Sequence, residues 1–348
     1  MRYADKKNLP KKFWHLLHRV LRLAAVVLLS ATLLLEPSDA NADRQAVKLL
    51  VGEPVAREQA GGEEIRYAFE ARQGQSYLLE VTQGGLDLLV SVEAPDGTRE
   101  DYGSPLFRNE SEFVMLHGSP EGLYFITLLA NEHPNSIGAH TIRVTDTRVS
   151  KTQKVAWRLL NDAAASNARS DRQSQLQALK NYETAATLLQ FTANARERAF
   201  ALYAAAMLNY WVLGEWHRAD RFAANAAQQY AAAGLTGHQA NAILLQAMTL
   251  TEAINEAALK DPILERVSAL LAESYAIHKQ LDSAAQLAKV RYFNALSHLN
   301  AGQYEQAKRY YSDAARLFRE LDDWAGERGV LLDRAVIDID TGNSIEAI

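Results

Sequence analysis

The feature that most constrains this chain is a helical pattern that recurs along its C-terminal half. Within residues 288–318, apolar and small side chains return every three or four positions, first before Gly302 and then after it. Gly302 suits the left-handed residue with which helices commonly end. The stretch therefore predicts two antiparallel helices joined by a tight turn. Its apolar positions are Tyr292, Ala295, Leu296 and Leu299 before the turn, and Ala307, Tyr311, Ala314 and Leu317 after it.

The same arrangement returns elsewhere, which indicates an internal repeat. Gly214, Trp216, Ala219, Ala223 and Ala226 lie 88 residues before their counterparts in 288–318. Partial matches are Ala178, Tyr182 and Ala185, then Val267, Leu271 and Ser274, and finally Gly342 and Ala347; the units are spaced by 41, 48 and 40 residues. Residues 149–348 are therefore expected to form four to five hairpins, the last one incomplete. The run 161–175 lacks an apolar stripe, so a long polar loop is expected there.

These positions resemble the tetratricopeptide repeat (TPR), in which small residues, a glycine and aromatic residues alternate at these offsets. The resemblance implies an α-helical solenoid, and the first helix of each hairpin would line a groove for a protein or peptide. The expected partner-binding residues of the two clearest units are Ala204, Leu208, Trp211, Tyr292, Leu296 and Leu299. The alternative is that the three leucines pack against the adjacent hairpin.

Residues 43–148 show a different period, because apolar side chains alternate with polar ones. Ile65, Tyr67 and Phe69 are one example, and turns rich in Gly, Pro and Asp separate such runs. Seven or eight short strands are expected, which favours an antiparallel β-sandwich. The expected fold class is thus multidomain, β plus α, with an N-terminal sandwich followed by the TPR-like solenoid.

The order of turn signals in this region resembles the pre-peptidase C-terminal (PPC) type of sandwich found on secreted bacterial proteins. The signals are Gly61-Gly62-Glu63, Gly74-Gln75, Asp87-Leu88, Pro95-Asp96-Gly97, Gly122-x-Tyr124 and the closing run His140–Val144. Some related domains bind calcium, for which Asp87 and Asp96 are the acidic candidates. Two isolated aspartates do not supply six oxygen ligands, and Asp96-Gly97 suits a hairpin turn. We therefore expect no metal and no cofactor.

Residues 1–42 read as a secretory signal peptide. A basic stretch precedes the apolar run Leu23–Leu35, and the small-x-small pattern Ala40-Asn41-Ala42 follows it. The run of 13 residues is shorter than the ~20 that a bilayer span needs. An uncleaved anchor is the alternative. Cleavage would give an exported protein that starts at Asp43, periplasmic or extracellular in a bacterium and free of the membrane.

The composition excludes several functions. The chain contains no cysteine, which rules out disulfides, thiolate metal sites and a Cys nucleophile. After residue 42 the net charge is about −9 with no basic run, which argues against nucleic-acid binding. Motifs for zinc proteases, serine hydrolases and nucleotide binding are missing. The histidines are scattered, and Asp338 and Asp340 are expected to be solvated, so we predict that the chain is not an enzyme.

Together these observations predict an exported, non-enzymatic scaffold that binds a protein or peptide. The first alternative is the regulatory N-terminal part of a CHAT-type (caspase-like) protease, since a PPC-like sandwich followed by TPR-like repeats resembles the front half of such proteins. That chemistry would need a His–Cys pair, which this chain cannot supply. The second alternative is carbohydrate or cell-surface binding through an exposed aromatic strip on the sandwich. The open apolar face of 329–341 also suggests dimerisation through the C-terminal repeat.

Overall fold

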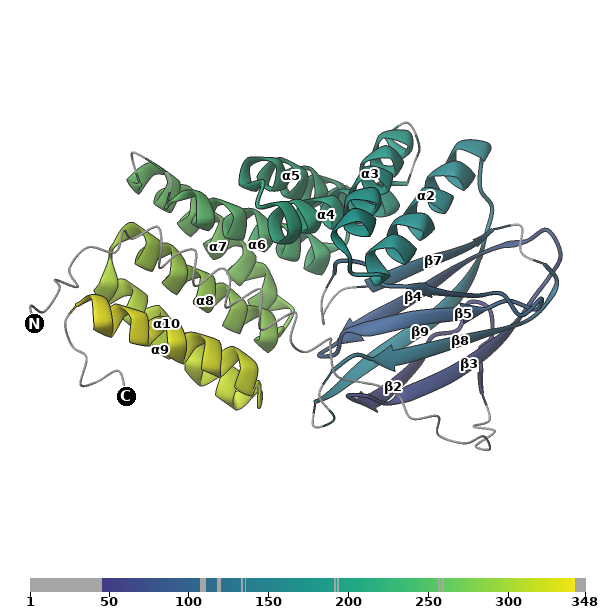
Figure 1. Cartoon of the computed structure of the whole chain (residues 1–348), viewed down its shortest axis with the longest axis horizontal. Helices are drawn as coiled ribbons and strands as arrows, with labels where there is room; N and C mark the ends of the chain where they lie inside the picture. Colours follow the sequence, from purple (N-terminus) through teal and green to yellow (C-terminus); the bar gives the residue numbers. More distant parts are fainter. Residues whose placement is uncertain are drawn as a thin grey trace, which may run out of the picture. The chain divides into compact units, whose positions relative to one another are not determined.

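The alternating pattern of residues 47–147 forms two β-sheets packed face to face (Figure 1). In this computed structural model the described residues are 46–106, 111–117, 120–132, 134, 136–190, 192, 194–255, 257 and 260–341. The predicted signal peptide and the Gly342 turn lie outside them. The strands are β1 (Val47–Lys48), β2 (Val55–Ala60), β3 (Glu64–Ala71), β4 (Ser76–Gly84), β5 (Leu88–Glu93), β6 (Arg99–Tyr102), β7 (Ser111–His117), β8 (Gly122–Ala130) and β9 (Ile137–Thr147).

One sheet has the strand order β1-β3-β8-β5-β6 and the other β2-β9-β4-β7. All pairings are antiparallel except the short one between β1 and β3. Inward side chains such as Tyr67, Phe69, Val81 and Ile126 are buried between the sheets. The sandwich prediction is confirmed, and β1 and β2 bring the described strands to nine, above the expected seven or eight.

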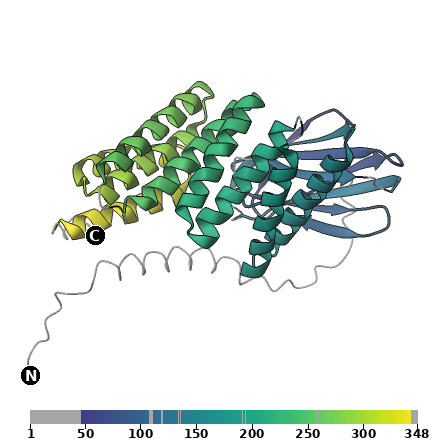
Figure 2. The same cartoon turned by 90° about the horizontal axis from the view of Figure 1, so that it is seen from above.

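The helical period of the C-terminal half forms nine α-helices within the described residues, stacked in chain order as a solenoid (Figure 2). Four hairpins are complete, and α10 is the first helix of a fifth repeat. The helices are α2 (Lys151–Ala168), α3 (Arg172–Leu189), α4 (Ala195–Leu208), α5 (Trp216–Ala232), α6 (Thr236–Ala253), α7 (Asp261–Gln280), α8 (Ala284–Ala301), α9 (Tyr304–Glu320) and α10 (Trp324–Asp340), with a π-helical turn η1 (Asn209–Leu213) after α4.

Small residues at the repeated positions allow the helices to approach closely. Ala307, Tyr311 and Ala314 are fully buried where α9 packs on α8, and Ala219 and Ala223 are fully buried in α5. Gly214 and Gly302 end their helices with positive φ, as the repeat predicts. Val267, Leu271 and Ser274 are also fully buried, so the weakest repeat match is confirmed as part of the array.

The long polar loop expected at 161–175 is wrong. Helix α2 continues to Ala168, and only residues 169–171 separate it from α3. Asn161 and Asn167 hydrogen-bond to the backbone of the sandwich, while Ala163 and Ala164 are buried. The stretch looks like a loop in sequence because these contacts with strands use small and polar side chains.

Helix α2 joins the two halves. It packs across β6 and β7, the outer strands of the two sheets, and Figure 1 shows it next to β7. The Asn161 amide accepts a hydrogen bond from Met115 N (2.9 Å) and donates one to Met115 O (2.7 Å), as a neighbouring strand would. Asn167 Nδ2 donates to Gly103 O at the end of β6 (2.9 Å). The sandwich and the array accordingly belong to one compact unit that begins at Ala46.

Candidate protein-binding surfaces

The six predicted partner-binding residues lie in three different environments. Ala204 and Leu208 of α4 are buried in the core that α4 shares with the neighbouring helices, and Leu296 of α8 is buried as well. Tyr292 and Leu299 are half-buried. Trp211 alone among the six is exposed, at 52%. The side chains that can reach a partner are therefore Trp211 and, in part, Tyr292 and Leu299.

Trp211 lies in the π-helical turn η1. The wider turn changes the direction of successive side chains, and such turns are frequent at functional sites. Asn209 is fully buried and donates from Nδ2 to Ala205 O (2.8 Å), while Glu215 N closes the turn on Asn209 O (3.0 Å). Tyr210 points inward, next to Trp216 (ring centroids 5.4 Å apart). Trp211 is thus held in the exposed position by a rigid turn.

Trp211 packs against an aromatic neighbour, Tyr210. Its ring meets that of Tyr210 edge to face, with centroids 4.8 Å apart. The hydroxyl of Tyr210 donates to Glu252 Oε1 of α6 (3.3 Å), which ties the turn to the next hairpin. Val212 and Leu213 are half-buried beside it. An exposed tryptophan on a rigid apolar base has the character of an interface hot spot.

Tyr292 has a structural contact that the repeat pattern does not reveal. Its hydroxyl donates to Asp333 Oδ2 of α10 (2.7 Å), and Tyr311 OH donates to the same oxygen (3.3 Å). Asp333 is buried, so these bonds compensate the loss of its hydration. Asp338 is also buried and pairs with Lys308 Nζ of α9 (2.7 Å). The expectation that Asp338 is solvated is wrong, because it anchors α10 on α9.

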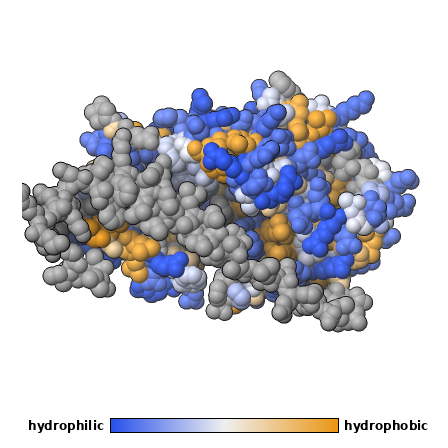
Figure 3. All heavy atoms as spheres, in the orientation of Figure 1, coloured by the Kyte–Doolittle hydropathy of each residue, from blue (hydrophilic) through white to orange (hydrophobic). Residues whose placement is uncertain are grey.

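The face of α10 opposite these anchors is open to solvent. Leu332 is 57% and Ile339 61% exposed, and Trp324 and Leu331 are exposed on the same helix. Four large apolar side chains on one helix of 17 residues are more than scattered surface hydrophobics. On the face shown in Figure 3 the described surface is mostly hydrophilic, with small separate hydrophobic patches. The α10 face and Trp211 are therefore the two candidate contact surfaces of the array.

Three histidines have lowered pKa values, two of them, His140 and His278, in buried positions. Burial lowers the pKa of His140 and of His278 to about 4, and it lowers the pKa of His238 as well. His140 Nε2 is 2.6 Å from the Tyr67 hydroxyl between the two sheets. Burial raises the pKa of that tyrosine to about 12. Both groups stay neutral near pH 7 inside the sandwich, which is the state of a core hydrogen bond.

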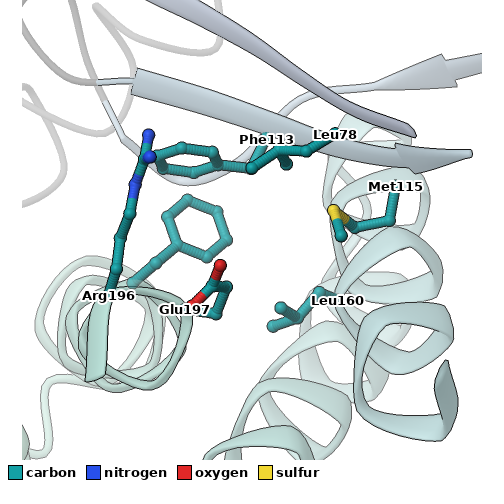
Figure 4. Close-up of a pocket in the computed structure, with 7 residues that line it drawn as sticks. Leu78, Phe113, Met115, Leu160, Arg196 and Glu197 are labelled. Carbon is teal, nitrogen blue, oxygen red and sulfur yellow. The ribbon is translucent and has the colours of Figure 1, made fainter. Parts of the chain in front are cut away.

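A small apolar cavity lies where the sandwich meets α2 and α4 (Figure 4). The ring of Phe113 faces the Arg196 guanidinium at 4.6 Å, and Arg196 also pairs with Glu80 of β4. The volume of the cavity, about 10 Å³, leaves room for at most about one water molecule. The lining residues are Leu78, Phe113, Met115, Leu160, Arg196, Glu197 and Phe200. The cavity is a packing defect of the junction and offers no room for a substrate.

The acidic candidates for calcium lie apart in two turns. Asp96 Oδ1 accepts a hydrogen bond from Thr98 N (2.9 Å), and this bond lowers the pKa of the Asp96 carboxyl. The main-chain oxygen of Asp87 accepts from Asn131 N. The described residues contain no group of three or more His, Asp or Glu side chains placed to hold a metal ion.

Among the helices that the structure describes, none is long and apolar enough to cross a membrane.

The aromatic strip required for sugar binding is not formed by the strand residues considered. Five of the six aromatic side chains are buried, and Phe125 is half-buried beneath the Arg66 guanidinium at 4.0 Å. The buried five are Tyr67, Phe69, Tyr77, Phe113 and Tyr124. Stacking on a sugar needs exposed ring faces, so these residues favour a core role.

Comparisons with known proteins leave the family open. No protein-family model matches the chain, and no curated protein matches its sequence. Among solved structures, a Rap protein complexed with competence and sporulation factor is similar over 57% of this chain, with 18% identity and a TM-score of 0.46. Aspartyl phosphate phosphatase F from Bacillus subtilis is similar over 56%, with 15% identity and a TM-score of 0.46. This chain spans about half the length of both structures, 53% and 50% respectively.

The sandwich has a separate structural neighbour. The pre-peptidase C-terminal domain of a collagenase from Bacillus anthracis is covered over its whole length by 30% of this chain, with 12% identity and a TM-score of 0.26. At these scores the similarities assign neither family nor activity. The resemblance to CHAT-domain proteins finds no support in these structures. What the structure itself establishes is the architecture, a two-sheet β region followed by a solenoid of helical repeats.

Proposed function

We propose that the chain is an exported, non-enzymatic scaffold whose helical array binds a protein or peptide partner. The observation that carries this proposal is the exposure of Trp211 on the rigid turn η1. Tryptophan is enriched among residues that dominate binding energy, and truncating such a hot-spot side chain to alanine weakens binding by about 2 kcal/mol or more. The proposal centres the partner site on Trp211, and it leaves Ala204, Leu208 and Leu296 as buried core residues and Tyr292 and Leu299 as half-buried residues that pack against the core cluster of α8 and α9.

Site-specific photo-crosslinking in the native host tests the partner site. A photoreactive phenylalanine analogue replaces Trp211 in one strain and Leu123, an exposed residue of β8, in a control strain. The expected result is a discrete adduct from position 211 that position 123 does not give. Adducts of one size from both positions, or none from position 211, would overturn the assignment of the site.

Export is a second part of the proposal and rests on the order of the basic, apolar and small-x-small segments in residues 1–42. Mass spectrometry of the protein purified from its host gives the start of the mature chain. A mass that corresponds to a chain beginning at Asp43 supports cleavage and export. A mass that corresponds to a chain still containing the apolar run Leu23–Leu35 would instead favour the uncleaved anchor.

A further inference from the structure

Three polar side chains lie buried next to one another in the core of the sandwich, one on each of three adjacent strands. They are Gln59 of β2, His140 of β9 and Gln83 of β4, which are 2%, 2% and 4% exposed. Gln83 lies directly opposite His140, and Gln59 lies two residues along β2 from Arg57, which pairs with His140. Side chains in these two relationships are about 5 Å and about 7–8 Å apart on one face of a sheet. The three residues, called the polar layer below, are therefore neighbours between the two sheets.

The two glutamines of the polar layer are held in fixed orientations by the main chain. Gln59 Nε2 donates to Glu63 O (2.7 Å) and to Leu128 O (3.0 Å), and Gln83 Oε1 accepts from Leu88 N (2.5 Å). A carbonyl oxygen only accepts and a backbone N–H only donates, so these bonds determine which end of each amide is the oxygen. Gln59 Oε1 and Gln83 Nε2 are then left without a hydrogen-bond partner among the described residues.

The tautomer of His140 is determined by a tyrosine of the opposite sheet. His140 Nε2 is 2.6 Å from the hydroxyl of Tyr67, and it is the only partner of that hydroxyl among the described residues. A buried hydroxyl proton needs an acceptor, so the Tyr67 O–H donates to Nε2 and the proton of the neutral ring lies on Nδ1. Nδ1 has no hydrogen-bond partner among the described residues. The polar layer thus presents two donors, at His140 and Gln83, and one acceptor, at Gln59.

A water molecule matches this set of atoms. Water can accept two hydrogen bonds and donate two, and a buried water in a protein typically makes about three bonds to polar groups that would otherwise have none. An ion does not match, because the ring of His140 is neutral and the layer lies in the apolar core of the sandwich. Arg57 and Glu63 next to the layer are exposed and opposite in charge. The expected ligand is therefore small and neutral.

We propose that the polar layer is a binding site for one water molecule, which accepts hydrogen bonds from His140 Nδ1 and Gln83 Nε2 and donates one to Gln59 Oε1. The water joins three strands of one sheet, and each of the three side chains also bonds the opposite sheet. It is therefore a structural part of the sandwich. This inference goes beyond the proposed function and does not depend on the partner site at Trp211.

A high-resolution crystal structure of the protein tests the geometry directly. The expected result is a density peak between the two sheets at hydrogen-bond distance, about 2.7–3.2 Å, from His140 Nδ1, Gln83 Nε2 and Gln59 Oε1. A direct bond between His140 Nδ1 and Gln59 Oε1, or no density at this position, would overturn the site.

A double-mutant cycle tests the shared water in solution. Gln59 and Gln83 lie on strands separated by β9, about 10 Å apart, and substitutions at such a distance have additive effects on stability unless a common partner links them. Gln59→Met and Gln83→Met each remove one bond of the water, and either substitution alone releases it. The folding equilibrium constant of the double variant should therefore exceed the additive expectation at least about fivefold, as urea denaturation measures.

The matched control pairs Gln59→Met with Gln246→Met, at a buried glutamine of α6 in the helical array. These two substitutions share no partner and should be additive. Additive effects of Gln59→Met and Gln83→Met as well would contradict a shared water. If one of these variants does not fold, the density in the unsubstituted protein decides the question.

Discussion

Helices α2 and α10 stand at opposite ends of the described helical array, and they differ in how their outer faces are covered. Helix α2 packs on α3 with one face and on the strands β6 and β7 with the other. Helix α10 packs on α8 and α9, while Leu332 and Ile339 on its other face remain exposed. Solenoid ends and sheet edges both need covering. At the α2 end, the helix covers the edge strands of the sandwich and these strands cover the outer face of the helix. At the α10 end, no described residue covers the outer face.

The largest expected effect concerns the aromatic contact at the α2 end. Phe200 of α4 is buried against Phe113 of β7, with ring centroids 5.0 Å apart. Phe200→Ala should lower the free energy of unfolding by about 3–5 kcal/mol, since it leaves a cavity in the shared core. Urea denaturation measures the loss. The half-buried Phe222 of α5 is the control, and equal losses for both alanine variants would contradict a special role of the junction.

Acid should destabilise the array through His278, which lies in α7 away from the junction. Burial, with a smaller contribution from Lys289, lowers its pKa to about 4. In the unfolded state His278 binds a proton near pH 6.5, whereas in the folded state it does so only near pH 4. The free energy of unfolding therefore falls as the pH drops through this window. The loss is at most about 3 kcal/mol.

Replacement of the ring tests this effect. Neither ring nitrogen of His278 has a hydrogen-bond partner among the described residues, so His278→Leu should cost little stability at pH 7. It should remove most of the loss between pH 6.5 and 4, as measured by urea denaturation across that range. His217→Gln, at an exposed residue of α5, is the control. An unchanged pH profile of His278→Leu would show that the acid sensitivity lies elsewhere.

The edge contact of α2 should have a somewhat smaller effect. Asn161→Leu removes both hydrogen bonds to Met115 and leaves the N–H and C=O of this edge strand unpaired. The expected loss is about 2–3 kcal/mol. Amide hydrogen exchange at Met115 should become faster, whereas exchange in α8 should not. Asn294→Leu, which removes only a bond within α8, is the matched variant. An unchanged exchange rate at Met115 would mean that another group pairs with the strand.

The smallest effect is expected at the α10 end. Tyr292→Phe removes one of the two tyrosine donors to the buried Asp333, which should cost about 1.5 kcal/mol and increase hydrogen exchange in α10. Tyr182→Phe removes a buried hydroxyl that has no hydrogen-bond partner among the described residues, and it should be neutral. A Tyr292→Phe variant with unchanged exchange in α10 would show that other contacts hold the helix.

Much of the fold was predictable because the repeat carries local information. The glycines that end α8 and η1, and the alanines at the helix contacts, occur at the spacing of the motif. The strands of the sandwich follow from their alternating pattern. Helix α2 was misread over 161–168 because its contacts with β6 and β7 use Ala and Asn, which have no helical apolar stripe.

The candidate site was less predictable. The motif marks which helix is the first of a hairpin, but it does not tell whether Ala204, Leu208 and Leu296 face an open groove or a neighbouring helix. They are buried against neighbouring helices, whereas Trp211, which lies in the π-helical turn at 209–213, is the exposed one of the six. The signals available were the Tyr210-Trp211 pair and the glycine that follows at position 214. The buried role of Asp333 and Asp338 had no local signal at all.

The sequence by itself determined the elements, the change from a period of two to a helical period, and the repeated hairpins. These features depend on neighbours a few residues apart, so side-chain size and glycine positions are sufficient to specify them. Only the tertiary structure decided that Asn161 pairs with a strand edge, that Asp333 is a buried anchor, and that Leu332 and Ile339 remain exposed. The apolar pattern of the sequence predicts which side chains can be buried. The surface that buries each of them is formed by residues far away in the chain.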